Sequence, residues 1–154
     1  MQTPVWRIES TGSPSVFQRS SITLSAITPT QVLIEVVAVG FNPVDTKIRA
    51  GLAPIAPDHG VLGSYVAGLV LEVGSAVTQF QKGDAVFGCA GGVRGHGGAL
   101  AKYMVAEAAL LAHAPKSIEL SQAAGLPIPA ITAQHLKRRL QLQAGDDVCV
   151  LGAS

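Results

Sequence analysis

The chain has 154 residues, of which 48% are hydrophobic and 14% charged, and its formal net charge is +1. This length suits one domain with a substantial core, and the small net charge argues against nucleic acid or an anionic membrane surface as a partner. No apolar run approaches the roughly 20 residues of a membrane span, and the N-terminus has no apolar signal-peptide core. The two cysteines, Cys89 and Cys149, lie far apart, so we expect a reducing compartment, the cytoplasm.

The first half of the chain predicts a β-rich fold with one short helix. The 17 glycines and 9 prolines of the whole chain are spread without a period, which is typical of a β structure with many turns. Residues 32–39 (VLIEVVAV) predict a buried strand. Residues 42–51 predict a helix, because Asn42 suits its N-cap, Pro43 its first turn and Gly51 its end.

Further strands are predicted after a proline-rich loop. Three β segments follow one another at 65–73 (YVAGLVLEV), 76–80 (AVTQF) and 84–88 (DAVFG). A glycine-rich stretch at 89–98 predicts a loop, and two more strands are predicted at 99–105 and 110–113.

The last part of the chain predicts helices and a final strand. Ser121 caps a helical stretch that Pro127 and Pro129 interrupt, and residues 130–142 form a longer helix. The apolar face of that helix is predicted to consist of Ile131, Leu136 and Leu140. Residues 148–151 predict a strand that runs into a glycine turn, as at the start of a dinucleotide-binding βα unit.

Five stretches in this order resemble the N-terminal part of the medium-chain dehydrogenase/reductase superfamily, in its quinone oxidoreductase branch. They are GFNPVDTKIRAG at 40–51, LGSYVAGLVLEVGSAVTQFQKGDAVFG at 62–88, GGALAKYMV at 97–105, AAGLPIPAITA at 123–133 and VLGAS at 150–154. The resemblance implies a mainly β (α+β) fold. Residues 1–120 would form a GroES-like β-barrel catalytic domain, and residues 121–154 would form connecting helices and the first strand of an incomplete Rossmann domain.

The resemblance also implies a zinc-independent member. Zinc enzymes of this superfamily have a cysteine where this chain has Asn42, and an LGHE motif where it has Ser64 and Tyr65 after Leu-Gly. A catalytic zinc needs three protein ligands, and these positions offer none. The four histidines have no mutual metal spacing; they are His59, His96, His113 and His135. We therefore expect no zinc, and chemistry that rests on hydride transfer from NADPH.

Two residues of the short helix are candidates for catalysis. By resemblance, the Asn42 side chain would lie at the cleft near the nicotinamide or the acceptor, while the local pattern equally predicts a helix N-cap. Lys47, one turn further, could donate a hydrogen bond or a proton to an acceptor carbonyl, or it could be an ordinary solvated lysine.

The resemblance assigns four other residues to the cofactor. Thr132 matches a position that approaches the nicotinamide, and Gly152, Ala153 and Ser154 match the start of the loop that binds the pyrophosphate. Tyr65 departs from the family, which usually has an acidic residue there. It could serve packing or reshape the acceptor pocket.

The function implied is transfer of a hydride from NAD(P)H to a quinone or another electrophilic small molecule with an activated C=C or C=O bond. Two alternatives remain open: a reductase of enoyl thioesters, and a non-catalytic fragment. Because only the beginning of a nucleotide site is present, we expect the 154-residue chain to bind NADPH weakly and to be inactive alone. The apolar final strand lacks parallel neighbours, so we also expect a homodimer, a disordered tail or limited solubility.

Overall fold

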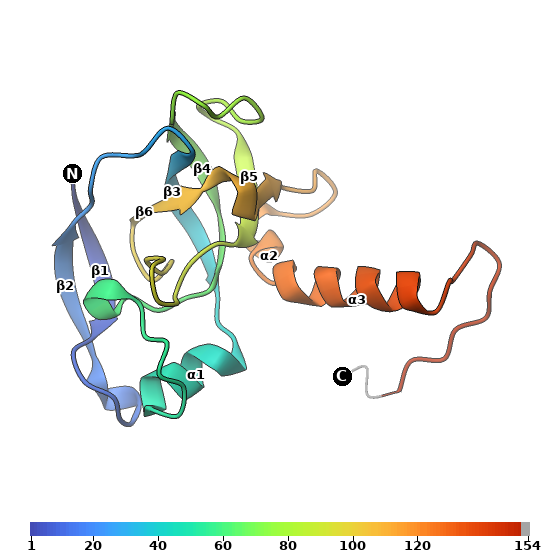
Figure 1. The fold of residues 1–154 in the computed structure, drawn as a ribbon, viewed down its shortest axis with the longest axis horizontal. Coiled ribbons are helices and arrows are strands. Elements are labelled where there is room, and N and C mark those ends of the chain that lie inside the picture. Colours follow the sequence, from blue (N-terminus) through green and yellow to red (C-terminus); the bar gives the residue numbers. More distant parts are fainter. Residues whose placement is uncertain (152–154) are drawn as a thin grey trace.

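The computed structural model describes residues 1–151, and it is built on two antiparallel sheets that curl into a barrel (Figure 1). The larger sheet has five strands in the order β6-β3-β4-β5-β7. Its strands are β3 (Gln31–Gly40), β4 (Tyr65–Val73), β5 (Ala85–Cys89), β6 (Tyr103–Glu107) and β7 (Leu111–His113). The smaller sheet pairs β1 (Gln2–Ile8) with β2 (Phe17–Thr23), and a bridge between Val5 and Ala101 links it to the segment before β6.

The core of the barrel lies between β3, β4, β5 and β6. It is formed by apolar side chains that alternate along these strands, including Val32, Ile34, Val66, Val86 and Met104. Strand β4 is buried along most of its length, because its other face is covered as well by the short helix α2 (Leu120–Ala123). Its near-continuous apolar sequence follows from this burial on both faces.

The strands predicted at 32–39, 65–73 and 84–88 are confirmed as β3, β4 and β5. The two later strands are confirmed with shifted bounds, as β6 and β7. Strands β1 and β2 had no prediction. The strand predicted at 76–80 is wrong, because the chain turns there: the Val77 N–H donates to the Gly74 carbonyl at 3.0 Å. The apolar residues of this segment, Val77 and Phe80, pack on the core from a loop, so their pattern resembles that of a strand.

The predicted short helix is confirmed as α1 (Pro43–Ala50). Asn42 occupies its N-cap, and Gly51 ends it in the left-handed conformation with φ of 83°. The helix is held against the barrel by Ile48, which is fully buried and packs with Ile8 and Leu62. Three single 3₁₀ turns complete the fold of the barrel: Pro14–Val16, Asp58–Gly60 and Ala108–Leu110.

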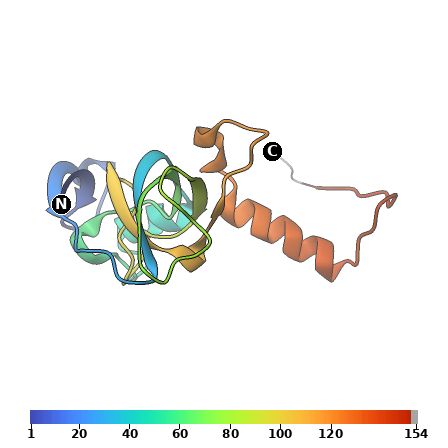
Figure 2. The same cartoon turned by 90° about the horizontal axis from the view of Figure 1, so that it is seen from above.

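The longer helix, α3 (Pro127–Arg139), begins earlier than predicted. Pro127 and Pro129 lie in its first turn, where a missing N–H costs nothing, so the prolines start the helix and do not interrupt it. The cap predicted at Ser121 is also displaced, because Glu119 is the N-cap of α2. Figures 1 and 2 show α3 extending away from the barrel, which leaves the face formed by Ile131, Leu136 and Leu140 exposed.

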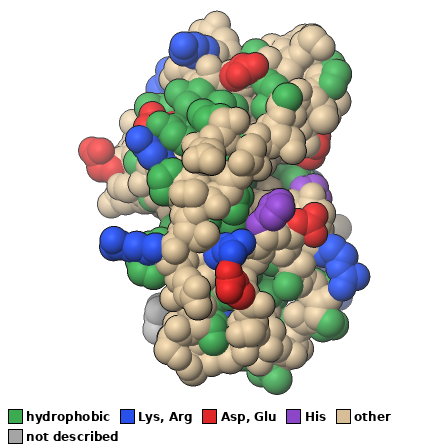
Figure 3. All heavy atoms as spheres, turned by 90° about the vertical axis from the view of Figure 1, so that its left-hand side faces the viewer, with side chains coloured by type: hydrophobic (Ala, Val, Ile, Leu, Met, Phe, Trp, Pro, Cys, Tyr) green, Lys and Arg blue, Asp and Glu red, His purple; other side chains and the backbone are tan. Residues whose placement is uncertain are grey.

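The strand predicted at 148–151 is wrong. These residues form no strand and are exposed, because no other strand of the described chain lies beside them to complete a ladder. The glycine turn predicted at 152–154 lies outside the described residues. No helix among residues 1–151 is long and apolar enough to cross a membrane. On the face drawn in Figure 3, Lys and Arg side chains stand among Asp and Glu side chains, so neither charge gathers there.

A buried carboxylate joins α1 to the start of β4. Asp45 is fully buried, and its Oδ2 accepts the N–H of Asn42 at 2.7 Å. Its Oδ1 accepts the N–H of Gly63 at 3.1 Å, and the Ser64 hydroxyl lies 3.0 Å from both oxygens. These donors compensate the carboxylate for its lost hydration, which would otherwise make burial of a charge very costly.

We expect Asp45→Ala to lower the free energy of unfolding by about 3 kcal/mol or more, because it leaves three buried donors without an acceptor. Urea unfolding, followed by circular dichroism, measures the effect. The matched control is Asp146→Ala, since Asp146 accepts the N–H of Gln143 at 2.7 Å in the same local geometry but on the surface. The control should change stability by less than about 1 kcal/mol, and an equal loss in both variants would contradict the role of burial.

Candidate functional site

A cavity of about 350 Å³ lies where α1, β4 and β5 meet the start of α3. Most of its wall is apolar, formed by Val44, Ala90, Val93, Leu110 and Ile128. The polar side chains in its wall belong to Asn42, Ser64, Tyr65, Cys89 and His96. An apolar cavity with a few convergent polar groups is the usual form of a small-molecule site.

Asn42 is positioned by the Asp45 network described above. Its backbone N–H is bonded to the carboxylate, which fixes the direction in which the side chain leaves the helix. The Asn42 Nδ2 atom is buried and has no hydrogen-bond partner among residues 1–151. A buried amide donor without a partner is unusual, and beside an apolar cavity it is available to a ligand.

Tyr65 is the first residue of β4 and is 4% exposed. It lies opposite Gly40 on β3 and opposite Cys89 on β5. Gly40 leaves room for the aromatic ring, because a Cβ at this position would lie 2.8 Å from Tyr65 Cδ2 and 2.2 Å from the Ala124 carbonyl oxygen. Burial raises the pKa of the Tyr65 hydroxyl, and the Asn42 side chain beside it offsets part of that rise.

Cys89 faces the same cavity from the end of β5. Burial raises the pKa of its thiol, and the negative charge of nearby Asp45 raises it further. The thiol is therefore protonated at neutral pH and is a weak nucleophile. Neither Cys89 nor Cys149 forms a disulfide within residues 1–151.

The structure brings only one of the predicted site residues into the cavity wall. That residue is Asn42; Lys47 lies on the exposed side of α1, and Thr132 is exposed on α3. Gly152, Ala153 and Ser154 lie outside the described residues. The sequence alone did not decide whether the Tyr65 side chain serves packing or shapes the acceptor pocket, because its neighbours Gly40 and Cys89 are distant in the sequence.

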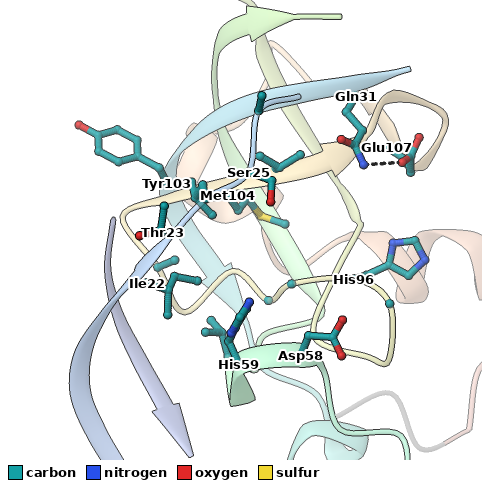
Figure 4. Close-up of a pocket in the computed structure, with 18 residues that line it drawn as sticks. Ile22, Thr23, Ser25, Gln31, Asp58, His59, His96, Tyr103, Met104 and Glu107 are labelled. Atoms are coloured by element: carbon teal, nitrogen blue, oxygen red, sulfur yellow. Dashed lines mark hydrogen bonds between the residues drawn. The ribbon is translucent and has the colours of Figure 1, made fainter. Parts of the chain in front are cut away.

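A second cavity, of about 220 Å³, lies between the end of β2, strand β6 and two loops (Figure 4). One polar pair in its wall is already satisfied, because Gln31 Nε2 donates to Glu107 Oε1 at 2.7 Å. Asp58, His59 and His96 lie around its loop side in Figure 4. No three His, Cys, Asp or Glu side chains among the described residues come close enough together to hold a metal ion. The first cavity, with its unpartnered amide, is therefore the stronger candidate.

Comparisons with known proteins agree on one family. Residues 28–116 match the family model described as the alcohol dehydrogenase GroES-like domain. The chain is 41% identical over 141 residues to the chloroplastic NADPH-dependent alkenal/one oxidoreductase of Arabidopsis thaliana, covering 88% of this chain and 36% of that protein. It is 36% identical over 156 residues to the quinone oxidoreductase of Homo sapiens, covering 96% of this chain and 45% of that protein.

Solved structures give the same result. An alcohol dehydrogenase superfamily protein from Novosphingobium aromaticivorans superposes with a TM-score of 0.83 at 40% identity, covering 93% of this chain and 44% of that one. The Escherichia coli quinone oxidoreductase complexed with NADPH superposes with a TM-score of 0.73 at 28% identity, covering 91% of this chain and 41% of that one.

The expected mainly β GroES-like fold is thus confirmed. The chain spans less than half the length of these relatives. The family model covers more than half of the chain, and the relatives match nearly all of it. The chain belongs to the alcohol dehydrogenase GroES-like domain family, in the quinone oxidoreductase-like branch of the medium-chain dehydrogenase/reductase superfamily.

Proposed function

We propose that this chain forms the acceptor-binding part of an NADPH-dependent oxidoreductase that reduces quinones or conjugated C=C and C=O bonds. The observation that carries the proposal is the buried, unpartnered Asn42 amide in the wall of an apolar cavity of about 350 Å³. Apolar walls suit the flat ring or alkyl chain of such an acceptor, and the amide can donate to its oxygen. Two relatives support this chemistry by name, an alkenal/one oxidoreductase and a 2-methylene-furan-3-one reductase from Solanum lycopersicum.

The described residues fit the nicotinamide end of NADPH, because Asn42 offers an amide donor beside apolar walls that suit a flat ring. We propose Asn42 and Thr132 as its contacts there, and Gly152, Ala153 and Ser154 as the start of its phosphate site. NADPH supplies a hydride when it is bound. The chain itself binds the acceptor, excludes water from it and holds its oxygen.

We propose that this chemistry needs no zinc. At the two zinc-ligand positions of related enzymes this chain has Asn42 and the Ser64-Tyr65 pair, and neither an amide nor these hydroxyls are ligands that zinc prefers. Without a Lewis acid, the protein can polarise a carbonyl only by hydrogen bonds. Quinones and enones suit such a site, because they are electrophilic before they bind.

We further propose a domain boundary near residue 120, where the chain leaves the barrel for α2 and α3. The exposed apolar side chains of α3 support the expected homodimer, because Ile131, Leu136 and Leu140 lie at the surface. The two free cysteines support a reducing, cytoplasmic location. Lys47 stays a candidate proton donor, since its amine is available at the surface of α1.

The activity is tested by following NADPH oxidation at its nicotinamide absorbance, with a quinone, an enal and the matching saturated aldehyde. The protein is expressed with its complete native reading frame, alongside the 154-residue chain. We expect turnover of the quinone and the enal but not of the saturated aldehyde, and weak NADPH binding by the 154-residue chain in calorimetry. The proposed function would be refuted if the protein expressed with its complete reading frame reduced none of these acceptors.

We expect Asn42→Ala to lower kcat/KM for the enal by about 10- to 100-fold, because it removes a buried donor to the acceptor oxygen. Steady-state kinetics with fixed NADPH measure the change. Thr46→Ala is the control on the same helix, since the Thr46 hydroxyl is exposed and bonds only the Pro43 carbonyl. A loss shared by both variants would indicate damage to α1 instead of loss of a contact.

The raised pKa of Cys89 predicts that this thiol survives an electrophilic acceptor. In Cys149→Ser protein, where Cys89 is the remaining thiol, alkylation by iodoacetamide at pH 7.5 should be at least about 10-fold slower than in Cys89→Ser protein. The rate should rise only above the pH at which an ordinary thiol ionises, because the raised pKa keeps Cys89 protonated to higher pH. Equal rates for both variants at neutral pH would contradict this protection.

A further inference from the structure

Tyr65, Asn42 and Ile128 all lie in the wall of the 350 Å³ cavity. The Asn42 side chain and the Ile128 backbone amide lower the pKa of the Tyr65 hydroxyl, against the larger rise that burial causes. Ile128 is in the first turn of α3, where backbone N–H groups point out of the helix and favour negative charge nearby. The rest of the wall is mainly apolar and includes Val93 and Leu110.

The Tyr65 ring has little freedom to move. It packs over Gly40, where a Cβ would lie 2.8 Å from the ring, and its backbone is paired on both sides with β3 and β5. A donor on a fixed ring costs little reorganisation when a ligand binds. Tyrosine is also a different chemical group from the acidic residue that the family usually has here, because it donates a hydrogen bond where a carboxylate only accepts one.

Building on the proposed function, we propose that Tyr65 determines acceptor specificity: its O–H and the Asn42 Nδ2 together donate hydrogen bonds to the carbonyl oxygen of a conjugated acceptor. The carbonyl oxygen would lie beside these two donors, and the apolar wall would hold the rest of the molecule. A carboxylate at this position can only accept a hydrogen bond, so the tyrosine adds a donor that a carboxylate lacks.

The two donors also serve the reaction. The hydride that bound NADPH would supply would form a C–H bond at the β-carbon of an enone; the C=C pair would become the double bond of an enolate, and the C=O pair would move onto the oxygen. A proton from solvent would then add at the α-carbon and give the saturated ketone, with the cofactor left as NADP⁺. Donors aimed at that oxygen stabilise the charge that develops on it, and this stabilisation is lost when the donor is removed.

The first test replaces the hydroxyl and keeps the ring. Tyr65→Phe should lower kcat/KM for cyclohexenone by about 10- to 100-fold, mostly in kcat, with the affinity for NADPH unchanged. The control is Tyr103→Phe, because Tyr103 is the other tyrosine of the chain and lies on β6, outside the cavity wall. Wild-type kcat/KM in Tyr65→Phe protein would overturn the proposal while leaving the proposed function standing.

The second test needs no turnover. In the ¹³C NMR spectrum of the 154-residue chain, tyrosine labelled at Cζ gives one signal for Tyr65 and one for Tyr103. The two signals are assigned with the two Phe variants. Adding cyclohexenone without NADPH should shift the Tyr65 signal saturably and leave the Tyr103 signal in place, and cyclohexene, which has no oxygen, should shift neither. An equal response to both compounds, or none at Tyr65, would overturn the proposal even if the protein reduces quinones.

The third test separates a donor from a packing residue. 3-Fluorotyrosine is incorporated at position 65 alone, by suppression of an amber codon placed there, so that no other tyrosine carries the more acidic phenol. Donation requires the protonated hydroxyl, so activity is present below the pKa of Tyr65 and falls as the pH rises through it. The alkaline fall should therefore move to lower pH in the fluorinated protein. An unchanged pH profile would assign Tyr65 to packing.

Discussion

The buried carboxylate of Asp45 fixes the position of the groups around the cavity. None of the ion pairs among residues 1–151 involves Asp45. Hydrogen bonds from Asn42, Gly63 and Ser64 therefore replace the water that would hydrate an exposed carboxylate. A charge satisfied only by hydrogen bonds tolerates little displacement of its donors, because each lost donor restores part of the desolvation cost. The helix that presents Asn42 and the strand that begins at Tyr65 are held in one arrangement for this reason.

Two glycines make that arrangement possible because they have no side chain. Gly63 has φ of 101°, a conformation that other residues rarely adopt, and in it the backbone N–H reaches Asp45. A Cβ on Gly63 would also lie 2.7 Å from Val39 Cγ2. Gly40 plays the corresponding part for Tyr65, because the ring occupies the space of the missing side chain. The network and the aromatic ring thus depend on backbone positions as much as on polar side chains.

The elements with local signals could be predicted from the sequence. The helix α1 has a cap at Asn42, a proline in its first turn and a glycine at its end, and strands β3 and β4 are long apolar runs. Where pairing with a distant segment decides whether a strand forms, the predictions from local sequence were wrong or missing. Residues 76–80 and 148–151 have the composition of strands but no partner strand, whereas β1 is a strand despite its weak pattern, because β2 pairs with it along its whole length.

The residues of the candidate site also differ in how far the sequence predicts them. Asn42 could be predicted from the motif that surrounds it, because its place at the N-cap follows from the local signals of α1. The environment of Tyr65 could not, since it depends on the pairing of Gly40 with Tyr65 and on the start of α3 lying beside the start of β4. Contacts of this kind join segments far apart in the sequence, and single-sequence patterns do not encode them.

Exclusion of water from the cavity affects both its hydrogen-bond donors and its cysteine thiol. The proposed function requires the site to bind an acceptor carbonyl firmly, yet the Cys89 thiol lies in the same wall. Exclusion of water strengthens hydrogen bonds from neutral donors, such as the Asn42 amide and the Tyr65 hydroxyl. The same exclusion raises the pKa of the thiol and keeps it in its unreactive form. A wetter cavity would weaken both effects, so under the proposed function the burial of this wall supports binding of the acceptor and protection of the thiol together.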